Sequence, residues 1–176
     1  MTNARYAVLL LLCALCAWAE VKVFPSKTHN VAQYRTYSWR APRIFTSSGM
    51  QEDDPVYAPL IRNAINRQLA AKGYQEVPQG GQLEVISAGV TSKSSQLEGY
   101  LTIFGTDYYS GIYSANASMP VTRVNHEGTL AVALYDPEAK ASIWAGYVQE
   151  ALGRGGAEGK LNDAAGKLFK KLPKRK

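Results

Sequence analysis

The strongest chemical pattern in the sequence is a glycine-rich stretch with basic residues, Gly153–Lys160. An expected strand precedes it and an expected helix follows it, which is the setting of a phosphate-binding loop. Such a loop requires Gly five residues before its Gly–Lys pair and Ser or Thr directly after it. Arg154 and Leu161 occupy those positions, so the stretch predicts a plain strand-to-helix connection. An anion site is the alternative, since free N–H groups at the helix start would lie near Arg154 and Lys160.

The histidines and acidic residues are further candidates for chemistry. His29 and His126 are far apart in the sequence, and neither belongs to a Gly-x-Ser-x-Gly or His-Glu-x-x-His pattern. His126-Glu127 lies in an alternating stretch typical of a surface pair, and a small hydrolase that uses His126 is the alternative. The acidic run 52–54 precedes an expected helix, whose N-terminus interacts favourably with negative charge. We therefore predict no catalytic, metal-binding or cofactor-binding residues, and a protein that is not an enzyme.

Aromatic residues alternate with glycines between residues 99 and 113. The aromatic side chains belong to Tyr100, Phe104, Tyr108, Tyr109 and Tyr113. Because aromatic residues are common in strands, we interpret them as a strand pair packed in the sheet. A contact surface for a partner protein, glycan or lipid headgroup is the alternative, since tyrosine presents apolar area with a polar tip.

The positive charge of the chain is concentrated at its C-terminal end. Residues 20–156 hold twelve Lys/Arg and twelve Asp/Glu, whereas residues 157–176 hold seven basic and two acidic residues, 7 − 2 = +5. The candidate anion-contacting residues are Arg154, Lys160, Lys167, Lys170, Lys171, Lys174, Arg175 and Lys176. This distribution argues against a nucleic-acid-binding domain, which spreads basic residues over its binding face. It predicts either a solvated helix face with a frayed end or a binder of anionic envelope components such as phospholipid or lipopolysaccharide.

The first nineteen residues have the pattern of a secretory signal peptide. Arg5 precedes the apolar run 7–17, and Ala17-Trp18-Ala19 supplies the small residues of a cleavage site. The run is too short to span a bilayer, which needs about 20 residues. We predict cleavage between Ala19 and Glu20 and export to the periplasm, where an envelope protein or an anionic polymer or lipid would be the partner.

Both cysteines, Cys13 and Cys16, lie within this leader. Cleavage after Ala19 would leave a chain without thiols or disulfides. A lipid anchor on Cys16, with outer-membrane association, is the alternative. Leucine stands directly before each cysteine, where lipidation requires a small residue, and this disfavours the anchor.

The remaining pattern predicts a single domain over residues 20–173 and a basic tail at 174–176. An amphipathic helix is expected with Asp53 or Asp54 as its cap, Pro55 at its first position and Gly73 after its end. Its polar residues Arg62, Asn63, Asn66 and Arg67 are expected mainly on the solvent side. A second helix is expected over 157–172, with Leu161, Ala164, Ala165, Leu168 and Leu172 on one face.

Five segments have strand-like patterns, and segment 99–113 is a less regular sixth: 21–23, 34–39, 83–91, 121–135 and 142–152. The stretch 42–54 has no periodicity and is expected to be a loop, and Asp136–Lys140 is expected to be a turn. Hairpins dominate this order. We therefore predict an α+β domain with a largely antiparallel sheet of about five to six strands and two helices packed on one face.

Six short motifs follow one another along the chain: Thr36-Tyr37-Ser38-Trp39, Leu69–Tyr74, Gly128-Thr129-Leu130, Asp136, Trp144-Ala145-Gly146 and Leu168–Pro173. In order and spacing they resemble a family of bacterial exported proteins and lipoproteins, the domain of unknown function 4136. The resemblance covers residues 20–173 and implies an α+β domain, export, frequent lipidation and no assigned activity or catalytic residues. The chain departs from the family at Gln82–Val85, where an Asp followed by an apolar run is usual, and in its leader, where a lipidation site is expected.

The matched residues have an architectural interpretation. We expect Tyr37, Trp39 and Trp144 to fill a core, Gly73 to end a helix and Gly146 to permit close packing. The resemblance therefore bears on the fold more than on any activity.

Overall fold

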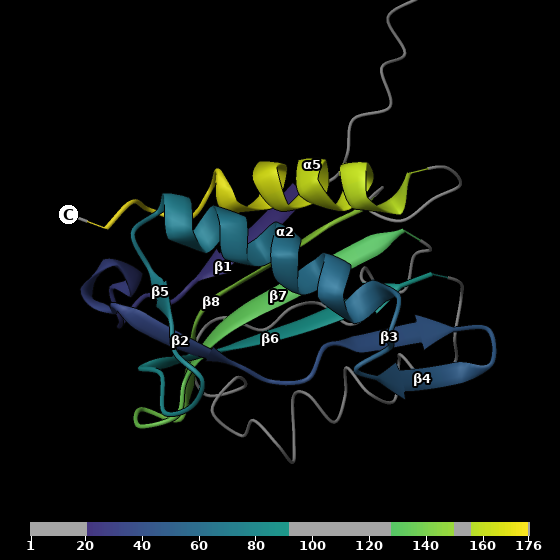
Figure 1. The fold of residues 1–176 in the computed structure, drawn as a ribbon. Helices are drawn as coiled ribbons and strands as arrows, with labels where there is room; N and C mark the ends of the chain where they lie inside the picture. The colour runs from purple at the N-terminus through teal and green to yellow at the C-terminus, as the bar shows by residue number, and fades with distance from the viewer. Residues whose placement is uncertain (1–20, 92–127, 150–155, 176) are drawn as a thin grey trace, which may run out of the picture.

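The structure is a computed structural model, and it describes residues 21–91, 128–149 and 156–175. A twisted sheet forms one layer, and two helices lie side by side on one of its faces (Figure 1). The helices are α2 (Tyr57–Ala71) and α5 (Ala157–Phe169), and a short 3-10 helix, η1, covers Val31–Gln33. The expected α+β class, single domain and pair of helices are confirmed.

Eight strands form the sheet in the described part of the chain. They are β1 (Val21–Pro25), β2 (Thr36–Trp39), β3 (Arg43–Thr46), β4 (Gly49–Glu52), β5 (Gln75–Glu76), β6 (Leu83–Val90), β7 (Thr129–Asp136) and β8 (Ala141–Val148). Their order is β1-β8-β7-β6-β2-β5, and β3 pairs with both β6 and β4. The pairs β1–β8, β8–β7, β7–β6 and β3–β4 are antiparallel. The pairs β2–β6, β3–β6 and β2–β5 are parallel. The sheet is thus mixed, with more strands than expected.

The stretch 42–54, expected to be a loop, contains the β3–β4 hairpin, so that prediction was wrong. Thr46 lies opposite Gly49, so only two serines connect the strands. Ile44 and Phe45 are both fully buried, Ile44 in the core cluster beneath the helices and Phe45 in a cluster on the opposite face of the sheet. A four-residue strand with both faces covered has no polar–apolar alternation, because neither of its central residues faces water.

The central strands bury side chains on both faces of the sheet. Leu83 and Val85 belong to the core cluster beneath the helices, and Ala88 and Val90 belong to the opposite cluster. Every residue of β7 and β8 is buried. The turn after β7 forms as expected, because the Asp136 carboxylate accepts hydrogen bonds from the backbone N–H groups of Glu138 and Ala139, at 2.8 and 2.9 Å.

The first turn of α2 differs slightly from the prediction. The helix begins at Tyr57, two residues after Pro55. The Asp54 carboxylate accepts hydrogen bonds from the N–H groups of Val56 and Tyr57, at 2.9 and 2.8 Å, so Asp54 satisfies donors at this end. The end of the helix is as predicted, because Gly73 has φ +89° and the Tyr74 N–H donates back to the Leu69 carbonyl.

Helix α5 buries the face that its sequence indicated. Leu161, Ala164, Ala165, Leu168 and Leu172 are all at most 4% exposed. Regular helix ends at Phe169, and single-turn hydrogen bonds continue it as far as Leu172. The helices run in the same direction: the Gln68 amide lies near Gly166, and the Lys72 ammonium donates to the Leu172 carbonyl. Both C-terminal ends therefore lie at the same edge of the domain (Figure 1).

Candidate functional site

A group of side-chain hydrogen bonds joins β2 to α2 through a single amide. The Tyr37 hydroxyl and the Trp39 indole Nε1–H both donate to Oδ1 of Asn66, at 3.0 and 2.8 Å. The Asn66 amide Nδ2–H in turn donates to the Glu76 carboxylate next to β2. We call Tyr37, Trp39, Asn66 and Glu76 the Asn66 network. It connects the family-like Thr-Tyr-x-Trp motif to the helix that covers it.

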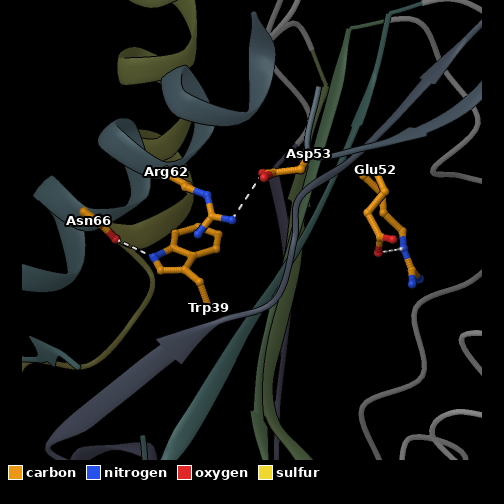
Figure 2. A network of polar contacts seen from close by, with 6 residues as sticks. Trp39, Glu52, Asp53, Arg62 and Asn66 are labelled. Atoms are coloured by element: carbon orange, nitrogen blue, oxygen red, sulfur yellow. Dashed lines mark hydrogen bonds and ion pairs between the residues drawn. The ribbon is translucent and has the colours of Figure 1, made fainter. Parts of the chain in front are cut away.

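The outer side of the Asn66 network is closed by an arginine. The Arg62 guanidinium lies 5.2 Å from the centre of the Trp39 ring and donates to the Asp53 carboxylate at 3.2 Å (Figure 2). Nearby, Arg43 of β3 pairs with Glu52 of β4 across the hairpin at 3.2 Å. These contacts hold the hairpin, the entry to α2 and β2 together. Trp39, which was expected to fill a core, is half-buried and packs against the core cluster.

The network was missed in the sequence because Arg62 and Asn66 were expected on the solvent side of α2. One signal could have found it: the two residues are four apart, so they share a helix face. Two aromatic residues at alternate positions of β2 supply the matching donors. The pKa of the Tyr37 hydroxyl is raised by its burial and by the Glu76 carboxylate, so it stays protonated and keeps its hydrogen bond to Asn66.

A second polar contact fixes the turn between β7 and β8. The Tyr34 hydroxyl donates to Asp136 at 2.7 Å, and the same carboxylate accepts the two backbone hydrogen bonds of the turn. Burial, followed by the Asp136 hydrogen bond and charge, raises the pKa of Tyr34. Asp136, one of the six family-like motifs, thus has a structural role in the turn.

Two residues of the Trp144-Ala145-Gly146 motif also have structural roles. The Trp144 ring packs against Phe169 of α5, with ring centres 5.4 Å apart. A Cβ on Gly146 would lie 2.8 Å from both the Leu168 side chain and the Lys22 carbonyl. Gly146 therefore lets α5 and β1 approach β8, as expected.

The predicted basic residues meet at the C-terminal ends of the two helices. Lys167, Lys170, Lys171 and Lys174 are exposed, and Arg175 is half-buried. The Arg175 guanidinium donates to the Gly73 carbonyl at 2.7 Å. Lys160 lies apart from them, in the first turn of α5 beside Glu158, so it does not join this group.

Several predicted residues lie outside the described parts of the chain. They are Ala19 and Glu20 of the cleavage site, Cys13 and Cys16, Arg154, Lys176, His126, and the aromatic residues Tyr100, Phe104, Tyr108, Tyr109 and Tyr113. The proposals attached to them stay untested by the structure.

His29, by contrast, is described and lies in the turn after β1. Its Nδ1 is 2.9 Å from the Thr28 hydroxyl and 3.5 Å from that of Ser26. Among the described residues, no group of three or more His, Cys, Asp or Glu side chains is placed to hold a metal ion. Over the same residues, neither helix combines the length and apolar character needed to cross a membrane.

The order of these motifs, and the sheet and helices that carry them, agree with one family model, the domain of unknown function DUF4136, which matches residues 21–174. The chain belongs to the DUF4136 family. The resemblance inferred from the sequence is therefore confirmed over almost the whole described domain. No curated protein matches the chain.

Two solved structures are similar to this DUF4136 chain. A DUF4136 family protein from Bacteroides thetaiotaomicron has a TM-score of 0.64 and 14% identity, covering 88% of this chain and 96% of that one. The PelC dodecamer from Paraburkholderia phytofirmans has a TM-score of 0.52 and 11% identity, covering 90% of this chain and 100% of that one. At these identities the likeness shows the fold alone.

Proposed function

We propose that this DUF4136 protein is exported and acts as a non-enzymatic accessory or binding domain of the bacterial cell envelope. The observation that carries the proposal is the position of the first strand. β1 begins at Val21, two residues after Ala19, and pairs with β8 from that residue onward. Cleavage after Ala19 would therefore leave every residue of the described sheet in place.

The described contacts give Asn66 and Asp136 structural rather than catalytic roles. The Asn66 amide and the Asp136 carboxylate each use their hydrogen-bonding capacity to join elements of the fold. A general base or nucleophile must keep an atom within hydrogen-bonding reach of the substrate. These two groups are instead held by strands, turns and helices.

Intact mass and cell fractionation of the protein expressed in an envelope-bearing bacterium test this proposal. We expect the soluble periplasmic fraction to contain a chain that begins at Glu20. Recovery of folded chain from the cytosol with residues 1–19 attached would contradict export. A mass increased by a diacylglycerol group, lost in a Cys16→Ser variant, would instead assign the anchored form.

Enzymatic activity is tested separately. The alternative hydrolase predicts an esterase or phosphatase activity that His126→Ala removes and His29→Ala leaves intact. We expect neither substitution to change turnover of such substrates from background. A His126-dependent activity would contradict the non-enzymatic proposal.

Self-assembly is a second candidate, favoured by the whole-chain similarity to a PelC subunit that forms a dodecamer. In the described sheet, β1 and β5 end the strand order and each has one neighbour. An open strand edge can pair with a second copy of the same chain. Light scattering after size exclusion would show an oligomer of defined mass, and a monomer throughout the micromolar range would contradict the candidate.

A further inference from the structure

Basic residues gather at the C-terminal ends of the two helices. We call the exposed lysines among them, Lys167, Lys170, Lys171 and Lys174, the basic end. Lys167 lies in the last turn of α5, Lys170 and Lys171 follow directly after the helix, and Lys174 lies beyond Pro173. Arg67 is exposed on the neighbouring helix, one residue before Gln68, which lies beside Gly166.

Acidic residues are missing from the segments that build this surface. The sequence has none between Asp54 and Glu76, and none after Asp163. Burial and then the charge of Lys174 lower the pKa of Lys72, which agrees with a local excess of positive charge. The four lysines of the basic end therefore account for four of the five net positive charges of residues 20–176.

Two of the basic residues at this edge, Lys72 and Arg175, have a structural use. Two parallel helices place the negative ends of both dipoles at one edge of the domain, where cations are favourable. Lys72 and Arg175 fill this need directly, by donating to the carbonyls of Leu172 and Gly73. These two bonds also fasten the chain after α5 to the end of α2. The four lysines of the basic end remain directed to solvent.

The apolar side of α5 is already occupied. Leu161, Leu168 and Phe169 are fully buried against the sheet, and Leu172 is 1% exposed. An amphipathic helix that inserts into a bilayer needs a free apolar face. Any membrane contact of α5 must therefore be made by its lysines, at the level of the headgroups.

We propose that the basic end binds the phosphate groups of an anionic phospholipid bilayer as a peripheral contact without insertion. The inference rests on the proposed export, which brings the chain to a membrane surface of this chemistry. Clustered lysines near an anionic bilayer each strengthen binding by about five-fold. Because the contact is electrostatic, it weakens as salt shortens the screening length from about 10 Å at 0.1 M to about 3 Å at 1 M.

The test is co-sedimentation of the processed chain with vesicles of phosphatidylglycerol and phosphatidylcholine, and with vesicles of phosphatidylcholine alone. We expect binding to the anionic vesicles only, and its loss at high salt. The variant K167Q/K170Q/K171Q should reduce the partition coefficient by about a hundred-fold. The matched control K27Q/R35Q/K140Q removes the same charge from exposed positions elsewhere, and it should bind nearly as wild type.

Each result bears on the inference. Equal losses in the two triple variants would overturn a localised surface, since net charge alone would then explain binding. Binding to lipopolysaccharide micelles without binding to the anionic vesicles would overturn the phospholipid assignment. Tryptophan quenching by brominated acyl chains would overturn the peripheral geometry, because no insertion is expected.

The failure of this inference is distinguishable from that of the proposed function. A periplasmic chain that ignores anionic vesicles overturns the lipid contact and leaves export standing. A chain that stays in the cytosol but binds vesicles in vitro overturns export, and the basic end then has no envelope membrane to bind. Circular dichroism of each lysine variant should match the wild type, because the substituted side chains are exposed.

Discussion

Replacing Asn66 by alanine is expected to destabilise the protein more than its surface position suggests. The substitution removes the acceptor shared by the Tyr37 hydroxyl and the Trp39 indole. Tyr37 is only 2% exposed, so water cannot readily replace that acceptor. Leaving a buried hydroxyl without a partner costs about 1–3 kcal/mol, and the loss at half-buried Trp39 adds about 0.5–1 kcal/mol.

The helix itself responds in the opposite direction. Alanine is a better helix former than asparagine by about 0.5 kcal/mol, which offsets part of the loss. Asn63 provides the matched control, because it is exposed on the same helix three residues earlier. Asn63→Ala should therefore gain slightly, and Asn66→Ala should be about 2–3 kcal/mol less stable than Asn63→Ala.

Urea unfolding followed by circular dichroism measures this difference, which corresponds to a melting temperature lower by about 5–10 °C in a domain of this size. A double-mutant cycle with Tyr37→Phe isolates the shared hydrogen bond, and the penalty of Asn66→Ala should shrink by about 1 kcal/mol in the Phe background. Equal stability of the Asn63→Ala and Asn66→Ala proteins would refute the reasoning, since the amide would then have no role beyond solvent contact.

Three further perturbations follow from other contacts. Because burial raises the pKa of Tyr37 in the folded state, folded protein holds this proton above pH 10, where the unfolded chain releases it. The free energy of unfolding is then unaffected by this group below about pH 10 and falls as pH rises further. Urea unfolding midpoints measured from pH 8 to 11 should fall less steeply for Tyr37→Phe than for wild type. Identical pH dependence of the two proteins would contradict the assignment. Gly146→Ala should destabilise by about 1–3 kcal/mol, because its Cβ would crowd Leu168 and Lys22. Gly159→Ala, with no atom within 4 Å of the new Cβ, should stabilise α5 by up to about 1 kcal/mol. Thermal melts in which Gly146→Ala is as stable as Gly159→Ala would contradict the close contact at Gly146. Asp136→Ala should lower the free energy of unfolding, measured in urea, by about 2–4 kcal/mol, because it removes the acceptor for three donors. Glu138→Ala, at an exposed position of the same turn, should change that free energy by no more than about 0.5 kcal/mol.

Local signals in the sequence predicted the elements that depend on short-range chemistry. The buried stripe of α5 was readable from Leu161 to Leu172, because helix periodicity repeats within a few residues. The Asp136 turn was readable for the same reason, since a carboxylate can accept from N–H groups two and three residues later. The end of α2 at Gly73 followed from the need for a positive φ.

The β3–β4 hairpin was not readable in this way. Ile44 and Phe45 are adjacent and buried on opposite faces of the sheet, so no alternation marks the strand. Its partner β6 lies more than thirty residues away, with Arg43 opposite Ala88. The same holds for the Asn66 network, whose donors and acceptor are separated by 27 and 29 residues.

The sequence by itself determined the α+β class, the apolar face of α5, the family and the concentration of basic residues near the C-terminus. Only the tertiary structure decided that two strands lie parallel to β6, that one asparagine joins β2 to α2, and that both helices end at the same edge. The physical reason is range. Periodicity, turns and caps depend on neighbours within one or two turns of chain, whereas strand partners and shared acceptors depend on how distant segments are packed together.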